Sequence, residues 1–185
     1  VLTPRLNAIT SMHPDLNLEI VSQTPGFSLS RREADVAVMV GKPTEPQLYF
    51  ESLGIYRLGL YASRDYSERH GLPGRVDQLP RHRLIGYVED LLFSERLNVA
   101  RNVWSSWQSN IAISSPVGQV AAVKAGLGIG VLHDFLLDNK DGLLPVFPDL
   151  DLSREFFLVW HPNIDRIPRI HTVLDFMRSL RNAVH

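Results

Sequence analysis

Three glycines at alternate positions, Gly126, Gly128 and Gly130, raise the first question of chemistry in this sequence. A glycine-rich loop that binds phosphate follows a strand and precedes a helix, whose free N–H groups face the phosphate. Here the order is reversed, because an apolar pattern of helical spacing precedes the glycines and the apolar run 129–132 follows them. We therefore interpret Gly126 as the end of a helix, and Gly128 and Gly130 as positions where a strand packs closely.

The start of that helix is a stronger candidate for binding. Ser115 fits the N-cap and Pro116 the first helical position. Several N–H groups of the first turn then lack helical partners, and the aligned peptide dipoles place partial positive charge there. Such a helix start is suited to a carboxylate or a similar anion. The alternative is that Ser114 and Ser115 only cap the helix.

Other chemistries lack their residues. None of the seven histidines forms an HxxxH pair, there is no GxSxG sequence, and cysteine is absent. Glu89 and Asp90 are adjacent, and neighbours on a strand point to opposite faces, so they make a poor acid–base pair. We expect no metal site, no cofactor and no catalytic residues.

Composition narrows the class of protein. The chain of 185 residues is 44% hydrophobic and 21% charged, which is typical of a soluble globular protein. Its formal net charge of −1 gives no bulk electrostatic reason for this chain itself to bind DNA or a membrane surface. No apolar run approaches the roughly 20 residues of a membrane span. The absence of cysteine fits a reducing compartment. The chain begins with Val1 rather than Met, so we expect it to be a fragment of a longer protein.

Hydrophobic patterning predicts an α/β fold with a mainly parallel sheet. The run 36–40 is continuously apolar, as in a parallel strand covered on both faces. We expect further strands at 18–22, 48–53, 56–62, 84–87, 111–114, 129–132 and 156–160, with helices from Leu2 to His13, over 116–125 and from Ile167 to Leu180.

Four stretches occur in a recognisable order. They are PRL at 4–6 with HP at 13–14 and LEIV at 18–21; READVAV at 32–38; VKAGLGIGVL at 123–132; and FLVWHP at 157–162 followed by VLDF at 173–176. Together they resemble the effector-binding domain of LysR-type transcriptional regulators, over nearly the whole chain. Two features depart from the family pattern: His133 stands where proline is usual, and the stretch between Gly26 and Asp35 is short.

The resemblance implies two Rossmann-like lobes joined by two crossover strands, as in type 2 periplasmic binding proteins. Lobe I would hold residues 1–62 and 141–185, and lobe II residues 63–140. The family's N-terminal winged helix-turn-helix is absent from this chain, as are the strand and loop that should precede Val1.

The resemblance also implies a small organic effector, which we expect to be anionic, in the cleft between the lobes. The loop 24–27 would supply a hydroxyl, an open backbone and the aromatic Phe27, which could equally be a core residue. The expected effector-binding residues are Thr24, Pro25, Gly26, Phe27, Lys42, Tyr87, Val88, Glu89, Ser114, Ser115, Pro116 and Val117.

The expected partners follow from the same resemblance. A homodimer or tetramer would form in the cytoplasm and contact DNA only through the missing N-terminal domain. In an antiparallel dimer, the first helix (Leu2, Leu6, Ile9) would meet Val120 and Val123 of its mate. The alternative function is a periplasmic solute-binding protein of a transport system; an enzyme on this architecture is a third class, which the missing acid–base groups disfavour.

Overall fold

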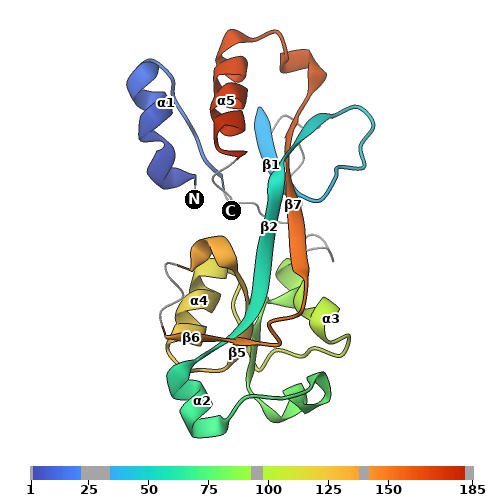
Figure 1. Cartoon of the computed structure of the whole chain (residues 1–185). Helices are drawn as coiled ribbons and strands as arrows, with labels where there is room; N and C mark the ends of the chain where they lie inside the picture. The colour runs from blue at the N-terminus through green and yellow to red at the C-terminus, as the bar shows by residue number, and fades with distance from the viewer. Residues whose placement is uncertain (1, 22–33, 93–97, 138–141, 182–185) are drawn as a thin grey trace. The chain divides into compact units, whose positions relative to one another are not determined.

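The computed structural model describes residues 2–21, 34–92, 98–137 and 142–181 (Figure 1). The chain divides into two compact units: unit 1 comprises Val1–Tyr56 and Arg154–His185, and unit 2 comprises Arg57–Ser153. Two strands, β2 (Tyr49–Ser63) and β7 (Leu152–Trp160), include residues of both units, as crossover strands must. The boundaries expected from the sequence, 62/63 and 140/141, both fall inside unit 2.

The strands follow the order β1-β7-β2-β5-β3-β4, with β6 paired to β2. The expectation of a mainly parallel sheet is correct only for part of unit 2. There β3 (Leu84–Gly86) pairs in parallel with β4 (Ile111–Ala112) and with β5 (Ile129–His133). β2 pairs antiparallel with β5 and with β6 (Leu143–Val146), and β7 pairs antiparallel with β1 (Val36–Val40).

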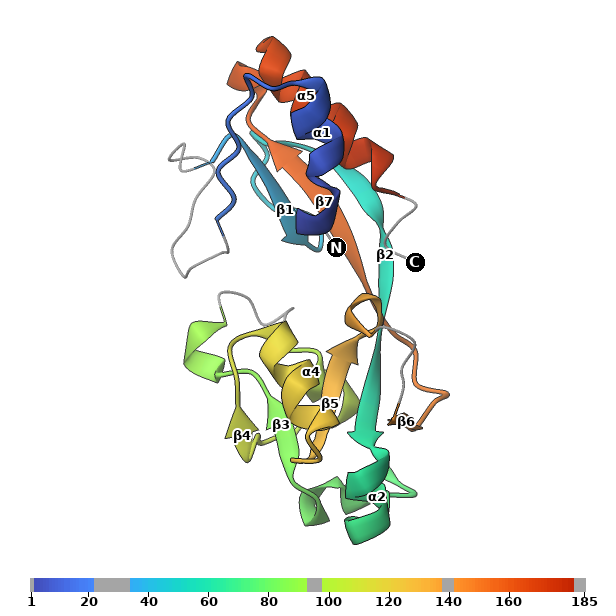
Figure 2. The same ribbon diagram turned by 90° about the vertical axis from the view of Figure 1, so that its left-hand side faces the viewer.

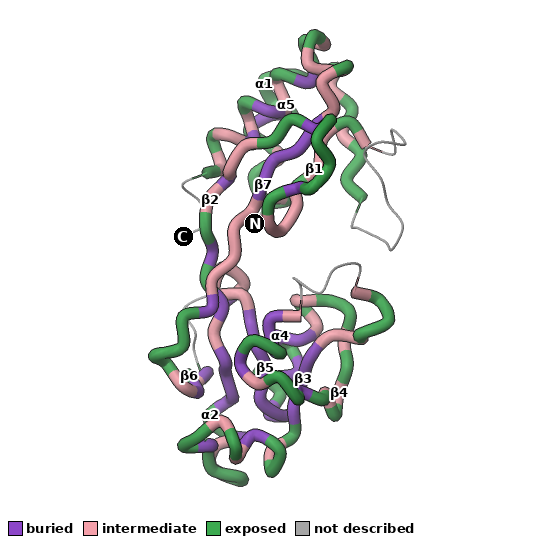
Figure 3. The backbone as a smooth tube through the Cα atoms, turned by 90° about the vertical axis from the view of Figure 1, so that its right-hand side faces the viewer, coloured by how far each residue is buried: buried purple, intermediate pink, exposed green. Residues whose placement is uncertain are grey.

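The helix predicted over 116–125 is α4 (Pro116–Lys124), and it covers the parallel strands of unit 2. Its Val120 and Val123 join Ile85 of β3 and Leu132 of β5 in one buried cluster, and Figure 3 shows the buried run of β3. Gly126 ends the helix with φ +71°, the left-handed conformation that favours glycine. Among the described residues, unit 2 also contains the helices α2 (Arg64–His70) and α3 (Ala100–Val103), with short 3₁₀ turns at Val76–Arg81, Glu89–Leu91 and Asp134–Leu136.

The role of the other two glycines is also confirmed. A Cβ on Gly128 would overlap the backbone carbonyl of Arg83, and a Cβ on Gly130 would lie 3.0 Å from Cγ2 of Val123. Neither position lies in a phosphate-binding loop, because the glycines follow α4 and lead into β5.

Unit 1 combines β1 and β7 with α1 (Asn7–Met12) and α5 (Pro168–Ser179), which lie on the same side of these strands (Figure 2). Leu158, Trp160, Ile170 and Leu174 form the centre of its core. The apolar periodicity of α5 explains this, because it directs one face of the helix toward β7. Short 3₁₀ turns occur at Thr3–Arg5 and Pro162–Ile164.

Three expectations about elements are wrong. Residues 48–53 and 56–62 do not form separate strands, because β2 continues through Gly54. Strand β1 is antiparallel to β7, with Val38 exposed, so it is not a parallel strand covered on both faces. Residues 16–21 have no regular secondary structure; the expected strand end at Ser22 lies outside the described residues.

The apolar faces assigned to a dimer contact are largely used within the chain. Ile9, Val120 and Val123 are buried inside their own units. These three side chains therefore offer little surface to a second copy, whereas Leu2 and Leu6 are half-buried, and the antiparallel dimer stays a prediction.

Candidate functional site

The carboxyl ends of the parallel strands of unit 2 meet at one edge of the sheet. Tyr87 follows β3, Ser114 lies two residues after the end of β4, and His133 is the last residue of β5. The N–H of Ile113 donates to the carbonyl of Gly86 at 2.8 Å, which keeps the two chain segments together beyond the strands. In open α/β sheets, ligands bind outside the carboxyl ends of the strands. This edge is our candidate site.

Helix α4 begins at this edge. Ser115 is its N-cap and Pro116 its first residue, as predicted, and Ser115 Oγ accepts a hydrogen bond from the Gly118 N–H at 3.3 Å. In α-helical geometry the N–H of Val117 has no partner within the helix. Ser114 and Ser115 are exposed and Val117 is 65% exposed, so this end of the dipole is open to a ligand.

Gln119 fixes the helix start to the strand end. Its side chain is 2% exposed, and its Nε2 donates to the carbonyl oxygen of Ile113 at 2.8 Å. Its backbone N–H donates to the carbonyl oxygen of Ser115 at 3.0 Å. The side-chain amide and the backbone N–H of Gln119 thus bind the two ends of the loop 113–115. These two bonds orient the serines at the edge.

Tyr87 and His133 face each other across the ends of β3 and β5. The Tyr87 hydroxyl lies 3.5 Å from Nε2 of His133. Burial raises the pKa of Tyr87 to about 12. Burial lowers the pKa of His133 to about 4, against the opposite influence of the neighbouring Asp134 carboxylate. That carboxylate accepts a hydrogen bond from the Tyr61 hydroxyl at 2.8 Å. Both facing side chains are therefore uncharged near neutral pH.

A small hollow of about 20 Å³ lies beside this pair. It is lined by Leu58, Ile85, Gly86, Tyr87, Val99, Ala100, Gln119, Val131 and His133, all residues of unit 2.

Glu89 is held by a cation that the sequence analysis did not identify. The Arg101 guanidinium contacts its two carboxylate oxygens at 2.8 and 3.0 Å, and Asn98 Nδ2 donates to the same carboxylate at 3.4 Å. Both charged side chains are more than half exposed, so the pair adds little stability. Its main effect is to tie the turn after β3 to the start of α3.

The structure brings together only part of the predicted site. Tyr87, Val88 and residues 114–117 share the carboxyl edge of unit 2. Lys42 belongs to unit 1, where its Nζ lies 5.0 Å from the ring centroid of Phe50. The predicted residues Thr24, Pro25, Gly26 and Phe27 lie outside the described residues.

His133, Gln119 and Arg101 were missed. A signal existed for His133, because it directly follows the predicted strand 129–132 and replaces the proline usual in the family that the sequence resembles. A residue in that position reaches the same edge as Tyr87.

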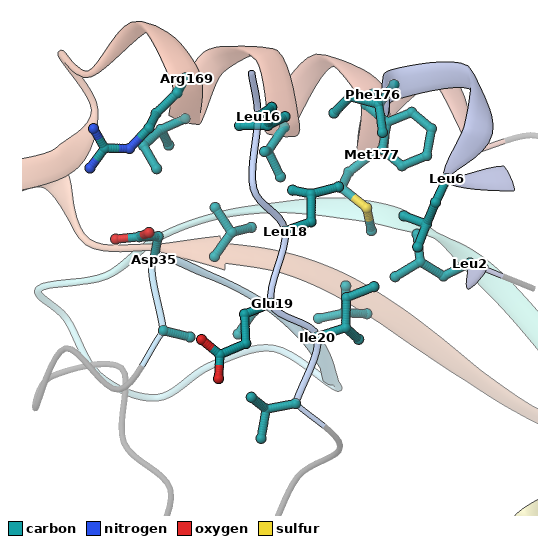
Figure 4. A pocket seen from close by; sticks show the side chains of 18 of the residues that line it. Leu2, Leu6, Leu16, Leu18, Glu19, Ile20, Asp35, Arg169, Phe176 and Met177 are labelled. Atoms are coloured by element: carbon teal, nitrogen blue, oxygen red, sulfur yellow. The ribbon is translucent and has the colours of Figure 1, made fainter. Parts of the chain in front are cut away.

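Unit 1 contains a second, larger hollow, of about 680 Å³, between α1, residues 16–21, β1 and α5. Figure 4 shows the apolar side chains of Leu6, Leu18 and Met177 around it. Its charged lining residues are Glu19, Asp35, Glu45 and Arg169, so carboxylates outnumber the one cation and disfavour an anion; we do not assign the effector to this hollow.

The described residues hold neither a cluster of metal-binding side chains nor a helix that could span a membrane. Within residues 2–21, 34–92, 98–137 and 142–181, no three His, Asp or Glu side chains are grouped as a metal ion would need. No helix in the described part of the chain is both long and apolar enough to cross a membrane.

Comparison with known proteins gives a consistent family. The family model described as "LysR substrate binding domain" matches residues 1–181. The HTH-type transcriptional regulator CrgA of Neisseria meningitidis is 26% identical over 184 residues, which cover 96% of this chain and 61% of that protein. An uncharacterized HTH-type transcriptional regulator of Haemophilus influenzae is 25% identical over 178 residues, with 90% and 60% coverage. The chain thus spans about three fifths of the length of these relatives.

Solved structures agree on the fold. The CrgA regulatory domain superimposes with a TM-score of 0.82 at 25% identity, covering 97% of this chain and 91% of that one. Full-length AphB of Vibrio cholerae, a virulence activator, gives a TM-score of 0.78 at 21% identity, covering 97% and 63%. With a family match over residues 1–181 and the same fold in CrgA, the chain belongs to the LysR substrate-binding domain family.

Proposed function

We propose that this chain is the ligand-sensing module of a LysR-type transcriptional regulator and that it binds a small organic anion at the start of α4. The observation that carries the proposal is the exposed helix start at Ser115–Val117, beside the carboxyl ends of β3, β4 and β5. Partial positive charge and the Val117 N–H point to a negatively charged group such as a carboxylate.

The module would act on DNA binding indirectly. A ligand shifts a conformational equilibrium only by its different affinity for the two states, so effector binding must favour one arrangement of the regulator. In this proposal the DNA-contacting part lies elsewhere in a longer, cytoplasmic protein that works as a homodimer or tetramer. The relatives named above are transcriptional regulators, which supports a sensor rather than an enzyme.

The family favours regulation over transport. The relatives named above are HTH-type transcriptional regulators, and none of them is described as a transport protein. The transport alternative, a periplasmic solute-binding protein, keeps the same two-unit architecture and would use the same ligand chemistry. Effector-dependent DNA binding by the full-length regulator would separate the two functions.

Calorimetry with matched variants tests the anion site. We would titrate a panel of small carboxylates and their neutral amides into the wild type, Ser115→Asp and Ser115→Asn. Asp and Asn both cap helices well, but only Asp adds a negative charge at the helix start. We expect carboxylates to bind better than amides, and Ser115→Asp to weaken carboxylates about tenfold, equivalent to about 1.4 kcal/mol. Ser115→Asn should bind them nearly as the wild type does. Equal carboxylate affinity in the Asp and Asn variants would mean that the helix start is not the site.

A further inference from the structure

The hollow between Tyr87, Gln119 and His133 has the size of a single polar group. Its volume is about 20 Å³. A space of about 10–15 Å³ measured in this way already holds one water molecule, provided that polar partners surround it. Here the partners come from three elements, the ends of β3 and β5 and the first turns of α4.

The two facing side chains offer one donor and one acceptor. The Tyr87 phenol has an O–H to donate, and a neutral imidazole protonated on Nδ1 presents Nε2 as an acceptor. Their 3.5 Å separation is at the long limit for a hydrogen bond. A hydroxyl in the hollow beside the pair would replace this long contact by two shorter bonds, one from the Tyr87 O–H and one to His133 Nε2. A hydroxyl matches this pair because it accepts and donates at once, whereas a carbonyl oxygen only accepts.

Charge would be disfavoured in the same place. Burial shifts the pKa of Tyr87 upward and that of His133 downward, so the surroundings of both groups penalise their charged forms. The same desolvation penalises a charged ligand group in the hollow. The carboxylate of an effector and its group in the hollow must then be different parts of the ligand.

We propose that this hollow is a specificity subsite that binds one hydroxyl group of the effector through Tyr87 and His133. This inference rests on the proposed function, which places the effector's carboxylate at the start of α4. The residues at that start, Ser115–Val117, precede Gln119 by two to four positions. The ligand class is a hydroxycarboxylic acid.

Matched pairs of acids test the subsite. We would measure by calorimetry the affinities of malate and succinate, lactate and propanoate, and 2-hydroxybenzoate and benzoate. For the pair that fits the edge, we expect the hydroxyl to raise wild-type affinity about tenfold, the effect of one good hydrogen bond. Tyr87→Phe keeps the ring and removes the hydroxyl, so this ratio should fall to about one.

Tyr66→Phe is the control. Tyr66 also faces an imidazole, with its hydroxyl 3.2 Å from Nδ1 of His82, but it belongs to α2 and does not line the hollow. The hydroxy-to-deoxy ratio should be unchanged in this variant. A second measurement needs no variant: the ¹⁵N shift of His133 Nε2 in the wild type should respond to the hydroxy acid and much less to its deoxy partner.

The outcomes separate the two proposals. Carboxylate binding that Ser115→Asp weakens, with a hydroxy-to-deoxy ratio near one in the wild type or unchanged by Tyr87→Phe, would overturn the subsite alone. Carboxylate binding that ignores Ser115→Asp, or no binding by any acid in the panel, would overturn the anion site and the subsite with it. If Tyr87→Phe does not fold, the ¹⁵N response decides.

Discussion

Replacing His133 should flatten the acid side of the stability profile. Burial lowers its pKa in the folded chain from the ordinary 6.5 to about 4. Between these values the unfolded chain binds a proton that the folded chain does not, so wild-type stability falls as the pH falls from 6.5 to 4. This difference in pKa lowers the free energy of unfolding by about 3 kcal/mol at low pH, where the effect is complete, and by about 2 kcal/mol at pH 5. His133→Gln lacks this contribution.

Urea unfolding at half-unit steps from pH 8 to 4.5, followed by tryptophan fluorescence, measures the effect. Trp104 and Trp107 lie in the same unit as His133 and report on its unfolding. The informative quantity is the difference between wild type and variant, because all other titrating groups are shared. His13→Gln, which removes an exposed imidazole of unit 1, is the control for loss of a histidine as such. Parallel profiles for wild type and His133→Gln would refute the argument that burial keeps this imidazole neutral.

Two packing predictions can be checked in the same unfolding assay. Gly128→Ala should lower the free energy of unfolding by about 1–3 kcal/mol, because the new Cβ would overlap the Arg83 backbone. Gly74→Ala is the control, since its Cβ would lie 3.7 Å from the nearest neighbouring atom, Gln78 Oε1. Equal effects of the two substitutions would contradict the close approach at Gly128. Leu174→Ala should lower the free energy of unfolding by about 2–5 kcal/mol, because the side chain is fully buried in the core of unit 1. Met12→Ala replaces an exposed side chain and should change the free energy of unfolding by less than about 0.5 kcal/mol. A loss as small as this at Leu174 would contradict the proposed core.

Local signals in the sequence were sufficient for α4. Ser115 and Pro116 at its start, and Gly126 with φ +71° at its end, act within one turn of the backbone. Their effect does not depend on the rest of the fold. The same holds for the close approach at Gly128, which the strand predicted after it made plausible.

The pairing of the strands could not be predicted from local sequence signals. The run Val36–Val40 looks like a parallel strand covered on both faces, yet its partner is the distant β7 and Val38 is exposed. An apolar run does not specify the direction of its neighbour, because that depends on chain connections far away in sequence. Likewise, an apolar helix face predicts burial but not which chain buries it, so Val120 and Val123 were assigned to a second copy.

The candidate site was predictable in part for the same reason. The helix start is a local feature, whereas the facing of Tyr87 and His133 depends on the parallel order of β3 and β5. The two residues are separated by 46 positions, and the sequence signal at His133 does not indicate which side chain it faces.

Strand β1 has a consequence for the behaviour of the protein in solution. In the described part of the chain it is hydrogen-bonded only to β7, and the larger hollow of unit 1 runs beside it. A strand edge with apolar surroundings accepts any extended backbone, which is how sheets grow between molecules. Glu19, Asp35 and Glu45 line this hollow. Arg169 balances only one of them, so two copies joined through this edge would bring like charges together, and these carboxylates oppose self-assembly.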